Sequence, residues 1–460
     1  LLIFAICAGL ATAALTGLAP ALQATRADYL GVVRSPGRAV TQCGTSIRRW
    51  LIAGEIAVVV VLLTSAALLV RSFAKLRGVD LGYETERVLS VETRWPTGRF
   101  VTPSRRPWFL VQQAVDGMVA EVRSIPGVEG AGLVTDLPLT GDPSSGSMWR
   151  ADAPGASGLK PPASARDQWK ADISVVTAGY FQALGIHFLK GRNFSEADRF
   201  TEEQLTNLET PRAGVAVINR VLAARYFPNE EPIGKTLVLF DDQTFGRTRT
   251  IVGIVADMRV RAVAEAARPM IFLPHAQYPN VTRPTIAVRS SLPPDVIAGA
   301  VRERLRLFDP QLLVLRTRTM NDVVSGALSR PRFNLLLVGS FAVVALGLAA
   351  IGTYGVVALL VTQRTREIGI RVALGARRPD ILHLVVREGM SPVFVGAAAG
   401  VVGSVAATSA IRSMLFGVTR LDPVSFAVAP VVLAAVALLA CYLAARGALR
   451  VDLLIALREE

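Results

Sequence analysis

The sequence predicts a membrane α-helical bundle of about five spans together with a large extracytoplasmic α+β domain. Only 19% of its 460 residues are charged, whereas soluble domains carry about 25%. The mean hydropathy is +0.42, and five apolar segments each approach the roughly 20 residues that a helix needs to cross a bilayer. Between the second and third segments lies a long stretch in which turn residues separate short β-branched runs. A protein that is soluble throughout is therefore not expected.

The five predicted spans are almost free of charged residues. Glu55 is the one acid within them. We interpret it as a side chain that lies near the interface or faces another helix, with an ion-coupling site as the alternative. The predicted spans are residues 1–19, 50–71, 333–363, 389–411 and 423–445.

The orientation follows from the arginines beside the spans, because basic residues close to a span are retained on the cytoplasmic side. Residues 20–49 carry five arginines against the single acid Asp28, and residues 364–388 carry six. The predicted cytoplasmic segments are therefore 20–49, 364–388 and the tail 446–460, and the predicted outside segments are 72–332 and the short loop 412–422. The net charge of +14 is assigned to this topology and to contact with an anionic bilayer, not to nucleic acid.

The outside segment 72–332 is predicted to be a folded α+β domain, because its short runs are rich in Val, Ile, Leu and Thr. Residues 138–162, rich in Pro, Gly and Ser, are interpreted as a loop or insertion. Four tryptophans, Trp95, Trp108, Trp149 and Trp169, are interpreted as core residues, and an apolar cleft is the alternative. The predicted strands are 87–93, 214–218, 250–255, 285–288 and 312–316, and the predicted helices are 108–124, 219–226 and 294–308.

Motifs for bond chemistry are not found in this sequence. Gly234-Lys235-Thr236 lacks the glycine that a phosphate-binding loop has five residues earlier, where this chain has Asn229. It is interpreted as a turn that enters a strand near Thr236. The three histidines, His187, His275 and His383, belong to no zinc-protease or serine-hydrolase motif. The three cysteines, Cys7, Cys43 and Cys441, are too few and too scattered for a disulfide framework or a zinc site.

The two ends of the chain resemble each other. Residues 26–34 and 450–458 both read R-x-D, then four residues, then an aliphatic residue and Arg, and both follow an apolar segment. Residues 1–19 are therefore interpreted as the last transmembrane helix of a preceding repeat, and 20–49 as a cytoplasmic basic linker. The alternative is that helices leaving a membrane acquire such tails independently.

One cytoplasmic segment, residues 362–381, is unlike a solvated loop. Its apolar residues Ile368, Ile370, Val372 and Leu374 have no cytoplasmic domain of their own to pack against. Its glycines permit close backbone approach, so the segment suits a partner protein. Further along, Gly396 and Gly400 have the small-xxx-small spacing that brings membrane helices together.

Residues 364–376, R-T-R-E-I-G-I-R-V-A-L-G-A, resemble the cytoplasmic signature of the MacB/FtsX-like ABC transporter permeases. Further resemblances to the periplasmic core of this family are G-Y-F-Q-A-L-G-I at 179–186, K-G-R-N-F at 190–194, and P-I-G-K at 232–235. The resemblance covers about residues 46–460.

The resemblance implies a half-unit of four spans with a periplasmic domain between its first and second spans, and the terminal repeat implies a duplicated, two-half permease. The rest of the first half is not in this chain, so we expect the chain alone not to make a working transporter. The family also implies that a separate ABC ATPase binds ATP and docks on the cytoplasmic side, with no cofactor on this chain. The implied ATPase-coupling residues are Arg366, Glu367, Ile368, Gly369, Arg371, Ala373, Leu374, Gly375 and Ala376.

The implied function is permease activity in the bacterial inner membrane, in which ATP-driven motion reaches the periplasmic domain for export or efflux. The other permease half, as part of the same full-length chain or as a second copy, is the second implied partner. Three alternatives stay open: a mechanical regulator of a cell-wall hydrolase, a lipoprotein-release permease, and a membrane-anchored sensor or enzyme. The substrate and any periplasmic or outer-membrane partner cannot be inferred from the sequence.

Overall fold

The computed structural model describes residues 39–96, 100, 108–152, 162, 169–206, 213–239, 248–279, 281, 283–363, 370–371, 374, 377–419 and 421–448. The chain divides into two compact units. The helical unit comprises Leu1–Phe73 and Phe333–Glu460, and the second unit, which we call the outer domain, comprises Ala74–Arg332.

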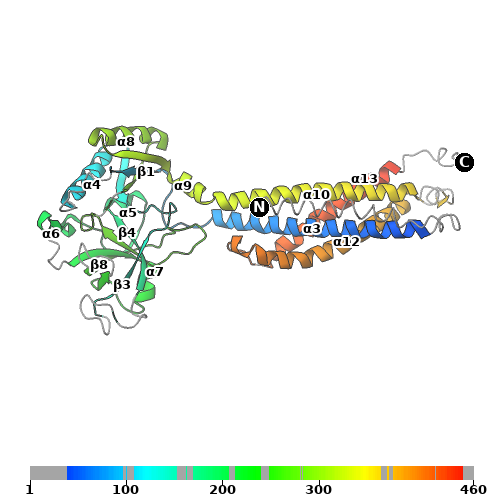
Figure 1. Cartoon of the computed structure of the whole chain (residues 1–460), viewed down its shortest axis with the longest axis horizontal. Coiled ribbons are helices and arrows are strands. Elements are labelled where there is room, and N and C mark those ends of the chain that lie inside the picture. Colours follow the sequence, from blue (N-terminus) through cyan, green and yellow to red (C-terminus); the bar gives the residue numbers. More distant parts are fainter. Residues whose placement is uncertain are drawn as a thin grey trace. The chain divides into compact units, whose positions relative to one another are not determined.

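The helical unit contains four long helices that run side by side (Figure 1). Each is long and apolar enough to cross a membrane, over Arg49–Arg77, Ser329–Gln363, Leu382–Ala410 and Pro423–Arg446. The predicted span at residues 1–19 lies outside the described residues. The full helices are α3 (Ala39–Arg77), α10 (Ser329–Gln363), α12 (Arg378–Ala410) and α13 (Pro423–Ala448), with a short 3₁₀ turn η3 (Arg412–Met414) between the last two.

Most of these helices extend past the apolar segments that predicted them, because hydropathy marks only the part that matches the bilayer core. The clearest difference is at α12, which begins at Arg378, inside the segment 364–388 that was predicted as a separate coupling segment. Pro379 occupies the first turn, where its missing N–H costs nothing. The Asp380 carboxylate accepts a hydrogen bond from the Arg377 backbone N–H at 3.1 Å, which caps the helix start.

A single apolar cluster joins all four helices. It contains Ile56 and Val60 from α3, Val357 from α10, Val393 from α12 and Leu433 from α13. The helices contribute unequally: 44% of the apolar window of α3 is buried, but only 11% of that of α10.

The outer domain is built on a four-stranded sheet with strand order β11-β1-β10-β2. All three neighbouring pairs are antiparallel, and helices α4 and α8 pack together and against these strands. In chain order this is β-α-β, a long insertion, then β-α-β, which is the ferredoxin-like arrangement. Its elements are β1 (Val88–Arg94), α4 (Trp108–Arg123), β2 (Val128–Val134), β10 (Thr285–Ser290), α8 (Pro294–Phe308) and β11 (Leu313–Thr319), followed by α9 (Met320–Ala327).

The insertion between β2 and β10 forms a ring of six strands. The pairings run β4-β3-β7-β8-β6-β9, and β9 then pairs in parallel with β4, which closes the ring. The ring connects to the four-stranded sheet through one residue pair, Val134 opposite Val176. The strands are β3 (Ser144–Arg150), β4 (Trp169–Val176), β6 (Ala213–Asn219), β7 (Thr236–Leu239), β8 (Thr248–Val255) and β9 (Met270–Pro274), with β5 (Phe188–Gly191) paired to β8.

The insertion also contains short helices, and one of them explains why residue 132 of β2 is a glycine. Helix α5 lies against β2, and a Cβ added at Gly132 would lie within van der Waals overlap of the Tyr180 backbone nitrogen. Only glycine permits this approach. The short helices are α5 (Gly179–Ala183), η2 (Glu196–Asp198), α6 (Glu202–Thr206) and α7 (Arg220–Tyr226).

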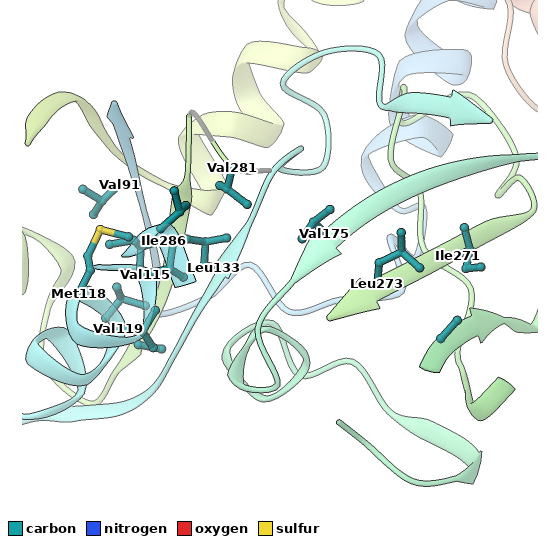
Figure 2. Packing of buried hydrophobic residues seen from close by; sticks show 14 of the residues in the cluster. Val91, Val115, Met118, Val119, Leu133, Val175, Ile271, Leu273, Val281 and Ile286 are labelled. Carbon is teal, nitrogen blue, oxygen red and sulfur yellow. The ribbon is translucent and has the colours of Figure 1, made fainter. Parts of the chain in front are cut away.

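One part of the outer-domain core lies where α4 and α8 cover the sheet, and it continues into the ring. Val111, Val115, Met118 and Val122 follow a helical period along one face of α4. Figure 2 shows Val115, Met118 and Val119 beside Val91, Leu133 and Ile286 of the sheet, with Val175, Ile271 and Leu273 of the ring farther along.

The predicted strands and helices of the outer domain all correspond to observed elements with small differences at their ends, and β7 begins at Thr236 as expected. Residues 138–162, interpreted as a loop or insertion, lie within the insertion between β2 and β10, but Ser144–Arg150 forms strand β3 and not loop. This strand is polar and is held by pairing with β4 and β7, while Met148 and Trp149 are buried. Strand formation there depends on neighbours in space and not on local propensity. Of the four tryptophans interpreted as core residues, Trp95 and Trp149 are buried, whereas Trp108 and Trp169 are half-buried and pack against the edge of apolar clusters.

Candidate functional site

The predicted coupling segment lies mostly outside the described residues. Of its nine predicted residues, the structure describes Arg371 and Leu374. The Leu374 backbone N–H donates to the Ile370 carbonyl at 3.0 Å, which is one turn of helical hydrogen bonding. Leu374 is 83% exposed and Ile370 is 55% exposed. Two aliphatic side chains with this exposure, next to α12, are available to a partner surface.

Gly396 and Gly400 of α12 lie directly against α3. A Cβ added at Gly396 would lie 2.5 Å from the Ala53 carbonyl oxygen, and one added at Gly400 would lie 2.6 Å from the Val60 Cβ. Real Cβ atoms do not approach other atoms this closely, so a larger residue at either position would push the two helices apart. The spacing of four residues places both glycines on the same face of α12.

A polar contact fixes α3 to the loop that joins α12 and α13. The Arg71 guanidinium makes an ion pair with the Asp422 carboxylate. The same carboxylate accepts hydrogen bonds from the Ser425 backbone N–H at 2.9 Å and the Ser425 hydroxyl at 2.7 Å, so it also caps the first turn of α13. One residue after Arg71, the Ser72 hydroxyl accepts from the Phe416 backbone N–H at 2.7 Å. We call the ion pair between Arg71 and Asp422 the Arg71–Asp422 contact.

Burial alone would raise the pKa of Asp422. Hydrogen bonds from Ser425 and the charge of Arg71 outweigh burial, so the pKa lies below its ordinary value. The carboxylate is therefore ionised at neutral pH. No pattern in the sequence predicts this contact, since its residues are 351 positions apart. The only local signal was Asp422 followed by Pro423, an N-cap followed by the first helical residue.

Glu55 faces another helix, in agreement with the favoured interpretation. A Cβ added at Gly352 of α10 would lie 3.2 Å from the Glu55 Oε2 atom. Glycine at this position lets the carboxylate approach the α10 backbone.

Comparison with known protein families identifies the family to which this architecture belongs. Residues 56–307, more than half of the chain, match the model of the MacB-like periplasmic core domain, and residues 339–453 match that of the FtsX-like permease C-terminal domain. The chain belongs to the MacB/FtsX-like family of ABC transporter permeases. Membership of this family implies a membrane protein with a periplasmic domain.

Individual relatives of this MacB/FtsX-like permease agree. The macrolide export ATP-binding/permease protein MacB of Marinobacter nauticus is 28% identical over 268 residues, which cover 55% of this chain and 39% of the relative. MacB of Hahella chejuensis is 28% identical over 305 residues, covering 63% and 43%. The chain thus spans less than half the length of these relatives. Among solved structures, the periplasmic region of MacB from Actinobacillus actinomycetemcomitans aligns with 56% of this chain and 98% of its own, at 13% identity and a TM-score of 0.34.

Proposed function

We propose that this chain is the transmembrane permease part of an ABC transporter, in which it passes ATP-driven motion from a separate ATPase to its outer domain for export. The observation that carries the proposal is topological. The outer domain, Ala74–Arg332, is inserted between α3 and α10, so it has two covalent connections to the membrane helices. A relative movement of these two helices must therefore reach the domain through both of its ends.

The packing of the helices supports a division of labour between the two connections. Helix α3 is held against α12 at Gly396 and Gly400 and against the α12–α13 loop by the Arg71–Asp422 contact. Helix α10 has the smallest buried share of the four. We infer that α3, α12 and α13 move as one body and that α10 moves relative to them.

The ATPase is proposed to dock on the segment that contains Arg366, Glu367, Ile368, Gly369, Arg371, Ala373, Leu374, Gly375 and Ala376. Exposed Ile370 and Leu374 support a protein contact here, because aliphatic side chains gain by being buried against a partner. ATP would be bound by the ATPase and not by this chain, and no enzymatic role is proposed for it. On this proposal the segment faces the cytoplasm, and the chain lies in the bacterial inner membrane.

Export is the proposed direction of transport, since the relatives are named for macrolide export and, in Pseudomonas syringae, for probable syringafactin export. The other half of the permease, from the same full-length chain or a second copy, is the second proposed partner. We also propose that Gly396 and Gly400 let α12 pack closely against α3 when the permease assembles in the membrane.

The direct test is purification of the full-length protein from native membranes in mild detergent, comparing wild type with Glu367→Lys. We expect an ATP-binding subunit to co-purify with wild type and to be lost from the variant. Glu303→Lys is the matched control, because Glu303 is an exposed acid on α8 of the outer domain. Absence of an ATPase from every preparation, with and without nucleotide, would contradict the transporter assignment. Equal recovery from all three proteins would contradict the docking segment.

A further inference from the structure

Glu55 is an acidic residue inside the membrane-spanning helix α3. The span begins at Arg49, so Glu55 lies about 9 Å along the helix axis from that end. Its side chain is half-buried. Within the part of the chain that the structure describes, the Glu55 carboxylate takes part in no ion pair or hydrogen bond. Acidic side chains inside a membrane are costly and as a rule have a partner, so this carboxylate marks a place where a further positive group fits.

The carboxylate lies beside a glycine of α10, in a space that no side chain of that helix fills. A Cβ added at Gly352 would lie 3.2 Å from Glu55 Oε2 and 3.9 Å from Oε1. Both oxygen atoms therefore lie near the glycine, and a larger residue at position 352 would occupy the space next to them.

Accessible apolar side chains flank this acid on both helices. Leu51 and Val58 lie on the same face of α3 as Glu55, since they are four residues before it and three residues after it. Leu348 has the same relation to Gly352 on α10. These three side chains are 62%, 58% and 57% exposed, respectively. We call Glu55, Gly352, Leu51, Val58 and Leu348 the Glu55 site.

The chemistry of the Glu55 site favours an organic cation over a metal ion. Hard metal cations take six or more oxygen ligands, and the described residues contain no group of three or more potential metal-ligating side chains. An ammonium group needs a single counter-charge, and its attraction to a carboxylate is stronger in an apolar medium than in water. Because the flanking side chains are exposed on helices that cross a membrane, a ligand with an apolar portion can reach the acid from the lipid.

We propose that the Glu55 site binds a lipophilic cation from the bilayer. The ammonium group pairs with the Glu55 carboxylate in the space beside Gly352, and the apolar portion of the ligand lies along Leu51, Val58 and Leu348. A protonated amine and a quaternary ammonium share the positive charge that matters here. The inference rests on the membrane location of α3 and α10 and not on ATPase docking, so each can fail without the other.

The test uses the full-length protein in nanodiscs and photoreactive ten-carbon probes that carry a diazirine in the chain. The probes have one of four headgroups: primary amine, trimethylammonium, hydroxyl or carboxylate. Labelled peptides are identified by mass spectrometry. We expect the two cationic probes to label peptides of α3 and α10 that contain the Glu55 site, and the other two probes to label them at least about tenfold less. The stronger of the cationic probes shows whether an N–H donor contributes. Unlabelled decyltrimethylammonium should compete, and sodium chloride at the same concentration should not.

Glu55→Gln should weaken labelling by the cationic probes about tenfold or more, because the amide keeps the shape of the side chain but removes its charge. Glu303→Gln is the matched control, because it removes an exposed acid of α8 in the outer domain, and it should leave labelling unchanged. Equal labelling of the site by the amine and hydroxyl probes, or equal labelling of Glu55→Gln and wild type, would overturn the proposal.

A second pair of variants tests the space beside the carboxylate. Gly352→Leu should also weaken cationic labelling, because the new side chain fills that space. Gly347→Leu on the same helix should not, since a Cβ added at Gly347 has nothing within 4 Å. Absence of cationic labelling from the wild type would overturn the proposal in favour of a basic residue of another helix as the partner of Glu55.

Discussion

Helices α3 and α10 connect the same domain to the bundle, yet they pack very differently. In α3, small residues of α12 press against the backbone at Ala53 and Ala57, and Arg71 is tied to Asp422. In α10, the buried residues Ala342, Ala349, Thr353, Val357 and Val361 form one narrow seam. Phe333, Phe341 and Val343, on the same helix, are more than half exposed. Two connections of similar hydropathy thus differ in how firmly the rest of the bundle holds them.

Apolar character alone therefore does not fix a helix in a membrane protein. Lipid tails are as apolar as leucine, so close packing and polar contacts decide which helices move together. On the proposed function, α3 belongs to the fixed body and α10 is the moving element.

The largest expected effect is at the α3–α12 contact. Gly396→Leu should cost about 1–3 kcal/mol of bundle stability, because the new side chain overlaps the Ala53 carbonyl and Ile56. Gly347→Leu on α10 is the matched control, since a Cβ added at Gly347 has nothing within 4 Å. Both are measured by unfolding of the reconstituted protein in denaturing detergent. A loss of stability as large in Gly347→Leu would remove the contrast between the helices.

A second comparison is made within α10. Val357 is 1% exposed and Val343 is 70% exposed. Val357→Ala should destabilise the bundle by about 1 kcal/mol, since it leaves a cavity without a change in water exposure. Val343→Ala should change the same unfolding midpoint much less. An equal loss of stability in the two variants would show that Val357 does not lie in the contact between α10 and the rest of the bundle.

A smaller effect is expected at the Arg71–Asp422 contact. The Arg71 side chain is 37% exposed, so solvent screens the pair and a coupling energy of about 0.2–1 kcal/mol is expected. The double-mutant cycle of Arg71→Gln with Asp422→Asn measures it, and asparagine is chosen because it still caps α13. Strictly additive effects of the two substitutions would show that the pair does not hold α3.

The smallest effect is its pH dependence. Because the pKa of Asp422 is lowered in the folded protein, the ionised carboxylate stabilises the fold above the ordinary aspartate pKa of about 4 and loses this contribution as pH falls through the lowered value. The stability difference between wild type and Asp422→Asn should therefore be constant from pH 8 to 5 and shrink only below about pH 4. A difference that already shrinks near pH 6 would mean that the carboxylate has a raised pKa.

Much of the fold could be predicted because its signals are local. Helix α8 begins and ends as expected, since Pro294 marks its start and Ile297, Val301 and Leu305 repeat at helical spacing. Strand β3 could not be predicted, because a Ser-rich strand is stabilised only by the strands beside it.

The polar contacts of the outer domain could not be predicted either, because they join residues that are far apart in the sequence. Gln112 is fully buried and donates to the Ala276 carbonyl at 2.6 Å, 164 residues away. No residue spacing in the sequence predicts this hydrogen bond. The contrast between α3 and α10 was equally hidden, because both are apolar around most of their circumference.

Distances between spin labels in the full-length protein, reconstituted in nanodiscs with the proposed ATPase, would show whether α10 moves relative to α3 and α12. Val58 of α3, Val343 of α10 and Val402 of α12 are exposed and suitable for labels, once Cys7, Cys43 and Cys441 have been replaced. We expect that trapping the ATPase in its ATP-bound state shifts the Val58–Val343 distance and leaves the Val58–Val402 distance unchanged. A shift in the Val58–Val402 distance with Val58–Val343 constant would contradict it.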